Sequence, residues 1–303
     1  MNALTAELHN ARCESMLRPG NTNCAGCGMS LGLQLFDQAL EREPITLVIP
    51  ACCGIVTAGA FPTSAYSVPT AASTFASAPA VATGLTVVAE LNGEHHPIVC
   101  WTGDGGTYDI GLATLSAAAE RNENIIYVCY DNEIYGNTGG QRSSATPAGV
   151  RTTTTPAGKI EPKKDIMAIM AAHRIPYAAT LSVAHREDFL RKVRTARRTP
   201  GFTFLHMLSP CPAGWKSEPD ESVDLIRKAV GSGVYPLYEV IGGMGYRINA
   251  RPDGTALADY TSHQRRYTGS SVDVDRLTRH IDAQWRYLEA MEKAFPWKDE
   301  TRS

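Results

Sequence analysis

Two strand-like segments that each end in a polar turn constrain the fold of this chain most strongly. Residues 97–101 are apolar and lead into a Gly-Asp-Gly turn at 103–105, and residues 124–130 lead into an Asp-Asn pair at 131–132. Residues 108–122 between them have the length of one crossover helix. Parallel strands joined in this way carry their ligands at their carboxyl ends. The sequence therefore predicts an α/β fold in which both polar turns meet at one edge of a mostly parallel sheet.

The two turns offer oxygen ligands of the kind that magnesium prefers. Asp104 carries a carboxylate and Asn132 an amide oxygen, and an octahedral Mg²⁺ usually shares its shell with substrate phosphates. A Gly-Asp-Gly motif alone is common in turns and has little predictive value. The two turns together, on neighbouring strands, predict a pocket for a diphosphate held by magnesium.

Four cysteines form a second group of candidate metal ligands. Cys24 and Cys27 make a C-x2-C pair around a tight turn at Gly26, just before an apolar helical run. Cys52 follows another strand-like segment, and Cys211 lies in a Pro-Cys-Pro motif. Four thiolates suit either a [4Fe-4S] cluster or zinc. The C-x2-C spacing by itself does not choose between the two metals.

Most of the remaining chain alternates between helical and strand-like segments, which favours a parallel sheet with helices on both faces. We expect a helix over the small-residue run 71–91 and one strand-like segment at 235–248. The other expected strands lie at 45–50, 177–183 and 202–208, and the other expected helices follow the C-x2-C pair and occupy 165–172, 185–199, 220–230 and 272–295.

Two segments depart from this alternation. Residues 137–162 are rich in Gly, Ser, Thr and Pro, and a connection of this length directly after a metal ligand is predicted to wrap a phosphate. The character of the chain changes after Trp215. We therefore predict a cofactor-binding domain at 1–216 and a C-terminal extension at 217–303. The extension is expected to pack as an arm on a partner subunit, and a flap that closes on its own domain is the alternative.

Composition excludes several classes of protein. The 303 residues carry 29 basic and 31 acidic side chains, so a net charge of −2 gives no basis for binding nucleic acid or an anionic membrane. No apolar run reaches the roughly 20 residues needed to span a bilayer, and residues 1–18 lack the apolar core of a signal peptide. The clustered cysteines indicate metal binding in a reducing compartment. We therefore expect a cytoplasmic protein.

The residues around both groups of ligands resemble the β subunit of pyruvate:ferredoxin oxidoreductases, in the thiamine diphosphate-binding 2-oxoacid:acceptor oxidoreductase family. The Gly-Asp-Gly turn and the segments 131–147, 163–166 and 210–215 carry the likeness, which spans roughly residues 18–216. The resemblance implies a thiamine diphosphate-binding fold and oxidative decarboxylation of a 2-oxoacid. Electrons would pass one at a time to a [4Fe-4S] cluster, and coenzyme A would take the acyl group.

The resemblance also implies roles for individual residues. The side chains of Asp104 and Asn132 and the carbonyl of Ile134 are expected to bind magnesium. Asn137 is expected beside the reacting substrate, where its amide would stabilise developing negative charge; a loop-stabilising role is the alternative. The further expected cofactor-binding residues are Gly103, Gly105, Gly136 and Thr138.

The cluster ligands follow from the same resemblance. Because Cys52 and Cys53 are adjacent, either can be the third ligand, and Cys52 aligns better with the family. His173 and His206 are expected to be structural, because neither ring is matched with an acid. The full expected set of cluster ligands is Cys24, Cys27, Cys52 and Cys211.

Partners are implied as well. In this family the carboxylate that activates thiamine comes from a pyrimidine-binding α subunit, and the chain has no ferredoxin-type C-x2-C-x2-C-x3-C run. We therefore expect a heteromultimer with α, γ and ferredoxin-like δ subunits that passes electrons to ferredoxin or another acceptor. Pyruvate is the favoured substrate, and phenylglyoxylate and oxalate are the alternatives. A flavin-type enzyme of the acetolactate synthase kind is disfavoured by the chain length, and a non-catalytic subunit stapled by zinc is the other class considered.

Overall fold

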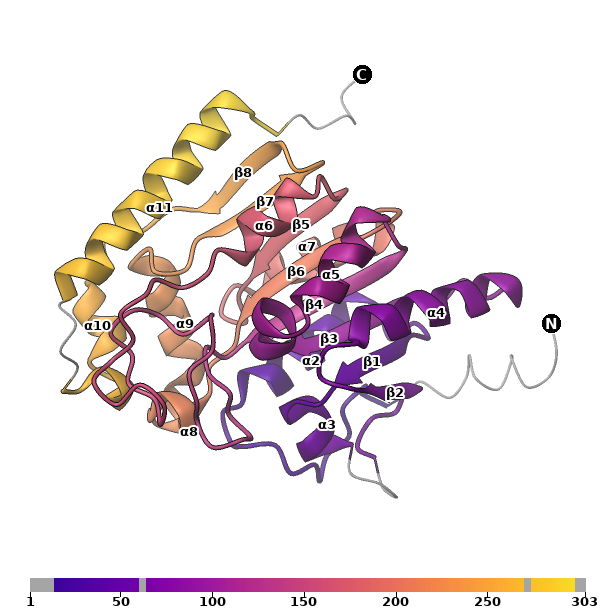
Figure 1. Ribbon diagram of the computed structural model, residues 1–303, viewed down its shortest axis with the longest axis horizontal. Helices are drawn as coiled ribbons and strands as arrows, with labels where there is room; N and C mark the ends of the chain where they lie inside the picture. Colours follow the sequence, from indigo (N-terminus) through magenta and orange to yellow (C-terminus); the bar gives the residue numbers. More distant parts are fainter. Residues whose placement is uncertain (1–13, 60–63, 270–273, 298–303) are drawn as a thin grey trace.

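The computed structural model describes residues 14–59, 64–269 and 274–297. A single eight-stranded sheet in the order β2-β1-β3-β4-β6-β5-β7-β8 runs through this part of the chain (Figure 1). The pairs from β2 to β5 are parallel, and β7 and β8 are added antiparallel. The strands are β1 Thr46–Pro50, β2 Thr70–Ser73, β3 Ile98–Gly103, β4 Ile125–Asp131, β5 Tyr177–Leu181, β6 Thr203–Leu208, β7 Leu237–Ile241 and β8 Gly245–Ala250. The expected α/β fold with a mostly parallel sheet is confirmed.

Helices cover both faces of the sheet (Figure 1). Helices α2, α7 and α9 share one apolar core with the sheet, and α4, α5, α6 and α11 share the other. The helices are α2 Gly28–Ala39, α3 Cys53–Ala58, α4 Ala78–Leu91, α5 Leu112–Glu120, α6 Ile166–Ala172, α7 Arg186–Arg198, α8 Pro212–Trp215, α9 Ser222–Gly231, α10 Leu257–Thr261 and α11 Val274–Ala294. Three short turns are the π-helical η1 Gly105–Asp109 and the 3₁₀ turns η2 Pro219–Glu221 and η3 Arg265–Tyr267.

The central strands β3, β4 and β6 are buried along their whole length and are mostly apolar, because both of their faces are covered. Side chains of β4 alternate between the two cores: Val128 and Tyr130 pack with α2 and α7, whereas Tyr127 and Cys129 pack with α4 and α5. All seven residues of β4 are buried. This burial fixes the register of the strand, so the polar pair that ends it is delivered to one edge of the sheet.

Two expected elements differ in the structure. The run 71–91 is expected to be one helix, but residues 70–73 form the edge strand β2 beside β1 and the helix begins only at Ala78. The segment 235–248 is two antiparallel strands, because Gly242 and Gly243 adopt φ of +56° and +68° in the turn between them. Glycine populates this left-handed region without steric cost.

The segment after residue 216 continues the sheet. Strand β7 pairs with β5, β8 pairs with β7, and α11 lies along β8 (Figure 1). The domain boundary at 216 and an arm on a partner subunit therefore stay predictions, and the structure shows this segment packed on its own chain. Within the described residues, no helix has both the length and the apolar character required to cross a membrane.

A buried carboxylate secures this junction between the two parts of the sheet. Glu239 on β7 accepts hydrogen bonds from Arg191 at 2.9 and 3.0 Å, from Asn249 at 2.6 Å and from Arg247 at 2.8 Å. Tyr177 of β5 also donates to it, at 2.8 Å. Burial raises the pKa of Glu239, but the hydrogen bonds and charge of Arg191 outweigh burial and hold the pKa at about 2.

Candidate cofactor site

A cavity of about 170 Å³ opens at the carboxyl ends of β1, β3 and β4. The expected magnesium ligands and the expected catalytic asparagine line the same cavity as two adjacent cysteines. The lining residues are Ala51, Cys52, Cys53, Phe75, Gly103, Asp104, Gly105, Tyr130, Asn132, Ile134, Tyr135, Gly136, Asn137 and Thr138. The structure thus brings together the residues expected to bind thiamine diphosphate and magnesium.

Asp104 is a buried carboxylate at the entrance to η1. Its Oδ2 accepts a hydrogen bond from the hydroxyl of Ser143 at 2.5 Å. Burial raises the pKa of Asp104 well above its usual range, and the negative charge of Asp131 adds to the shift. A divalent cation against this carboxylate would favour its ionised form and offset both effects, so the residue fits a magnesium ligand.

Gly105 leaves no space for a side chain at this turn. A Cβ atom there would lie 2.4 Å from Cε1 of Tyr135 and 2.8 Å from Cζ of Phe75. A Cβ atom on Gly103 would meet the ring of Tyr130 at 3.5 Å, which is an ordinary contact. Packing within the chain therefore requires glycine at 105. A side chain at 103 would make only ordinary contacts, so packing within the chain does not require glycine there.

The loop that is expected to bind magnesium begins at Asp131, the last residue of β4, and we call residues 131–141 the magnesium loop. Asn132 Oδ1 accepts a hydrogen bond from the amide of Ile134 at 3.3 Å, which folds the loop back on itself. Asn137 points an Oδ1 acceptor toward the thiol of Cys53 at 3.8 Å. Thr138 donates its hydroxyl to Gln141 at 2.6 Å. Thr138 therefore has a partner within the loop, and Asn137 and Thr138 both line the cavity.

The cysteine loop, which we define as residues 209–217, is docked against the C-x2-C turn. The amide of Gly28 donates to the carbonyl of Pro210 at 2.9 Å, and the amide of Cys27 donates to Cys24 at 3.1 Å. The expected tight turn at Gly26 is present, with φ of +70°. Cys211 accepts a hydrogen bond on its sulfur from the amide of Gly214 at 3.4 Å. These contacts bring the C-x2-C pair beside Cys211.

The two adjacent cysteines face different surroundings. A Cβ atom on Gly136 would lie 3.7 Å from Cys53 Sγ and 3.9 Å from Cys211 Sγ. Burial raises the pKa of Cys53 to about 12, and the neighbouring thiol of Cys211 adds to the shift. Cys52 is buried beside the hydroxyl of Tyr130, and its pKa is also raised by burial. Across the described ranges, no three His, Cys, Asp or Glu side chains already surround a point where a metal would sit.

A buried polar cluster lies directly behind the magnesium loop. The carboxylate of Asp131 forms an ion pair with Lys163 at 2.5 Å. It also forms hydrogen bonds with Nε2 of His206 at 2.9 Å and with the hydroxyl of Tyr108 at 2.8 Å. Burial raises the pKa of Asp131, but the charge of Lys163 and the hydrogen bond of His206 outweigh it and leave the pKa well below its usual range. The expectation that His206 has no matching acid is therefore wrong. A cavity of about 210 Å³ adjoins the cluster and reaches helix α11.

Sequence reasoning assigned no role to two residues that support this site, although both lie in segments that carry the family resemblance. Ser143 binds Asp104, and Lys163 also binds Glu133 at 2.9 Å. The run 163–166 gave a signal for Lys163 because it belongs to the family resemblance. His173 behaves as expected, with a hydrogen bond between its Nε2 and the hydroxyl of Ser116 at 2.8 Å.

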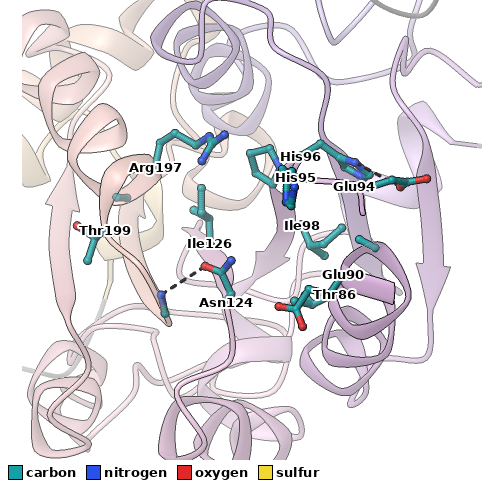
Figure 2. Close-up of a pocket in the computed structure, with 14 residues that line it drawn as sticks. Thr86, Glu90, Glu94, His95, His96, Ile98, Asn124, Ile126, Arg197 and Thr199 are labelled. Atoms are coloured by element: carbon teal, nitrogen blue, oxygen red, sulfur yellow. Dashed lines mark hydrogen bonds and ion pairs between the residues drawn. The ribbon is translucent and has the colours of Figure 1, made fainter. Parts of the chain in front are cut away.

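A third hollow, of about 160 Å³, lies at the opposite edge of the sheet, at the amino ends of β3 and β4 (Figure 2). His96 lies 3.6 Å from Glu94, and Asn124 accepts a hydrogen bond from the amide of Gly201 at 3.3 Å. His96 also shares a hydrogen bond with Thr46 at 3.0 Å. These polar groups satisfy one another and contribute nothing to the cofactor cavity.

Comparison with known proteins agrees with this geometry. The profile of the family described as thiamine pyrophosphate enzyme, C-terminal TPP-binding domain, matches residues 52–207. The matched segment contains β3 and β4 and both turns of the expected magnesium site. Fold and site thus define the class as a thiamine diphosphate (thiamine pyrophosphate) enzyme.

Individual relatives narrow the class. Ketoisovalerate oxidoreductase subunit VorB of Pyrococcus horikoshii is 40% identical over 291 residues, which cover 91% of this chain and 93% of the relative. Pyruvate synthase subunit PorB of Methanothermobacter thermautotrophicus is 41% identical over 278 residues, covering 89% and 96%. A solved 2-oxoglutarate:ferredoxin oxidoreductase from Magnetococcus marinus has the same fold, with a TM-score of 0.58, 22% identity and coverage of 91% of this chain and 97% of that chain. The chain belongs to the family of thiamine diphosphate-dependent 2-oxoacid oxidoreductase subunits.

Proposed function

We propose that this chain is the thiamine-binding β subunit of a coenzyme A-acylating 2-oxoacid oxidoreductase that acts preferentially on pyruvate. The observation that carries the proposal is the position of Gly136. It belongs to the magnesium loop, and it lies beside the sulfurs of Cys53 and Cys211. A thiamine site and a cysteine site that share one backbone residue suit an enzyme that takes electrons directly from its substrate adduct.

Magnesium binding is assigned to the oxygen atoms at the ends of β3 and β4. Asp104 supplies a carboxylate that is unfavourable without a cation, because burial and Asp131 both oppose its charge. Asn132 and the carbonyl of Ile134 come from the turn that faces it across the cavity. Ser143 orients the Asp104 carboxylate from the far side of the site.

Cluster binding is assigned to the cysteines around the docked C-x2-C turn. Cys24, Cys27 and Cys211 are three of the four proposed ligands of a [4Fe-4S] cluster. For the remaining ligand, which comes from the adjacent pair Cys52 and Cys53, we favour Cys53, because it lies with Cys211 beside Gly136. The seven cysteines within the described residues are free thiols, as a metal site in a reducing cytoplasm requires.

When bound, thiamine diphosphate would supply a nucleophilic carbon for the keto group and an electron sink for decarboxylation. The chain supplies position and electrostatics. Asn137 lies beside Cys53 at the cavity, and its Nδ2 hydrogens would donate to the substrate oxygen as negative charge develops there. Gly103 and Gly136 let the backbone approach the cofactor closely.

Partner subunits complete the proposed enzyme. An α subunit would supply the activating carboxylate, γ and ferredoxin-like δ subunits would complete the complex, and ferredoxin would accept the electrons. The names of the VorB and PorB relatives describe them as subunits, which supports a multi-subunit assembly.

An anaerobic visible spectrum of the purified complex tests the proposal, with iron, sulfide and zinc quantified before and after substrate is added. We expect a broad brown band that bleaches when pyruvate and coenzyme A are both present. A colourless complex that contains zinc would contradict the electron-transfer function and favour the zinc-stapled class.

The substrate needs its own comparison, because VorB and PorB relatives match this chain almost equally, at 40% and 41% identity. Pyruvate, 2-ketoisovalerate, phenylglyoxylate and oxalate should therefore be compared by their rates of bleaching in the same complex. Fastest bleaching by pyruvate is the expected result. Faster bleaching by 2-ketoisovalerate would assign the chain to the branched-chain enzymes without affecting the proposed chemistry.

The third cluster ligand can be identified by a matched pair of substitutions. Cys53→Ala is expected to lose most of the iron, because the Cys53 sulfur faces the same space as Cys211. Cys52→Ala is expected to retain the iron, because that sulfur is buried beside Tyr130. Iron content and the electron paramagnetic resonance signal of the reduced complex measure the difference. The opposite pattern would make Cys52 the ligand.

A further inference from the structure

Arg266 belongs to the C-terminal segment of the chain but lies against the cofactor site. It occupies the middle of η3, and its side chain is completely buried. Burial of a guanidinium is unfavourable unless the group is paired and hydrogen-bonded. Its partners therefore indicate what the position serves. The preceding residue on the same turn, Arg265, is exposed.

One partner of Arg266 is in the magnesium loop. Its Nη2 donates to Oε2 of Glu133 at 2.7 Å, and Glu133 stands between the proposed ligands Asn132 and Ile134. Glu133 has φ of +64°, a left-handed conformation that is unfavourable for a residue with a side chain. The ion pairs with Arg266 and with Lys163 hold Glu133 in this conformation.

The other partner is in the cysteine loop. The guanidinium carbon lies 4.1 Å from the centre of the Trp215 ring, within the range of a cation–π contact. Trp215 ends helix α8, and its amide donates to the carbonyl of Cys211 at 2.7 Å. The indole nitrogen of Trp215 donates to the carbonyl of Asn132 at 2.8 Å. Arg266 and Trp215 together therefore touch both loops.

The remaining contacts of Arg266 hold the guanidinium in one orientation. Its Nε donates to Gln264 at 2.8 Å, and Nη2 also reaches the hydroxyl of Tyr260 at 3.3 Å. Nη1 has no hydrogen-bond partner among the residues that the structure describes. The backbone carbonyl of Arg266 accepts the amide of Arg151, which belongs to the long connection after the magnesium loop.

We propose that Arg266 is a positioning residue that locks the magnesium loop to the cysteine loop. The guanidinium pairs with Glu133 on one side and stacks on Trp215 on the other, so neither loop shifts without the other. Loss of the guanidinium would leave only the Lys163 ion pair on the Glu133 carboxylate and only the hydrogen bond to Asn132 on the indole nitrogen, so both loops would be held less firmly. The assignment of cofactors to the two loops rests on the proposed function, whereas the mechanical coupling of the loops does not.

The test compares three variants in the assembled complex with its partner subunits. Arg266→Met keeps an unbranched apolar chain, Arg266→Lys keeps the charge without the planar fork, and Arg265→Met is the control on the same turn. Hydrogen exchange is measured first, on the complex depleted of thiamine diphosphate. In Arg266→Met we expect faster exchange in both 131–141 and 209–217, and we expect Arg265→Met to match the wild type. Faster exchange confined to 257–268 would overturn the proposal.

Cofactor binding and reduction potential supply a second readout. Calorimetric binding of thiamine diphosphate with Mg²⁺ is expected to weaken about tenfold in Arg266→Met, as is typical when an outer-shell partner of a metal site is lost. The potential of the cluster, followed by electron paramagnetic resonance, is expected to become more negative, because a buried positive charge favours the reduced form. Arg266→Lys should lie between Arg266→Met and the wild type. Wild-type affinity and potential in Arg266→Met would overturn the proposal.

Two further observations separate the possible failures. If Arg266→Met does not assemble, Arg266→Lys decides the test, since it keeps a charge beside Glu133 and removes the planar group that stacks on Trp215. Faster exchange in 131–141 would support the coupling, and unchanged exchange would overturn it. A wild-type complex that binds neither iron nor thiamine diphosphate would contradict the proposed function, and the exchange result would still decide whether Arg266 couples the loops.

Discussion

The buried carboxylate of Asp104 destabilises the folded chain when it is ionised without a ligand, and the same carboxylate is suited to bind a cation. Its carboxylate is buried, and Asp131 places a second negative charge nearby. Because the pKa of Asp104 is higher in the folded state than in the unfolded chain, its ionisation opposes folding. The cofactor-free protein therefore loses stability as the pH rises from the ordinary carboxyl range toward the raised pKa.

Asp104→Asn is expected to separate stability from function. At neutral pH the cofactor-free variant should melt at a higher temperature than the wild type, because the buried charge is gone. Its affinity for magnesium and thiamine diphosphate should fall by more than about 100-fold, beyond the usual cost of losing an outer-shell partner. Thermal melting with and without the cofactors measures both effects. A variant that is less stable without cofactors and binds them normally would show that Asp104 has a structural role.

The sequence predicts which residues lie at the ends of strands, but it does not predict which side chains pair at the site. The positions of Asp104 and Asn132 could be predicted because each directly follows a strand, and parallel strands align their ends. His206 lies 75 positions from Asp131, and Arg266 lies 133 positions from Glu133. Such pairs depend on how neighbouring strands and the C-terminal segment pack, and no local pattern encodes that packing.

At the level of elements, the sequence was informative where burial dictates the pattern. Strands β3 and β4 are covered on both faces, so they are continuous apolar runs with sharp polar ends. Strand β2 was missed because its Thr-Ala-Ala-Ser sequence suits a helix as well as a strand. Its hydrogen bonds to β1 decide the outcome, and they are not visible in the local sequence. The Gly242-Gly243 turn was readable in principle, since two glycines in succession favour left-handed turns.

Strand β7 carries a pH dependence through Glu239. The pKa of Glu239 is about 2 in the folded protein, compared with about 4.3 in an unfolded chain. Its contribution is therefore complete above the unfolded pKa and is lost as the pH falls from about 4.3 toward 2, an effect of roughly 3 kcal/mol. Urea unfolding of the cofactor-free chain across this range should show the loss in the wild type.

Glu239→Gln is expected to flatten this profile. The variant should be less stable at pH 7, because Arg191 and Arg247 lose a shared carboxylate, and it should approach the wild type near pH 2. Glu187→Gln is the matched control, since Glu187 is an exposed residue of α7. Parallel pH profiles for the wild type and Glu239→Gln would show that Glu239 does not control the acid transition.

The molecule as a whole presents a cofactor cavity at one edge of the sheet. The cavity is built from β1, β3, β4 and their loops, and the cysteine loop after β6 meets the same edge. In the proposed enzyme, the carboxylate that activates thiamine comes from the α subunit and not from this chain. The complete reaction is therefore a property that we predict for the assembly and not for the isolated subunit.

Expression of the chain without partners tests this prediction. Release of labelled carbon dioxide from carboxyl-labelled pyruvate should be roughly 100- to 10,000-fold slower than in the co-expressed complex, the range that a positioned proton-transfer group contributes. Addition of the separately purified partners should restore the rate. Equal rates for the isolated chain and the complex would place the activating carboxylate within this chain.

The pairing of β7 with β5 determines how far the chain can be shortened. A fragment that ends at residue 216 would contain all of the proposed cofactor ligands, and it would lack both Arg266 and β7. The hydrogen-bonding edge of β5 that β7 now occupies would be open to other chains, and such an edge promotes intermolecular association. Expression of the ligand-bearing portion alone is thus expected to give aggregates, and co-expression with residues 217–303 as a separate peptide is the natural route to rescue it.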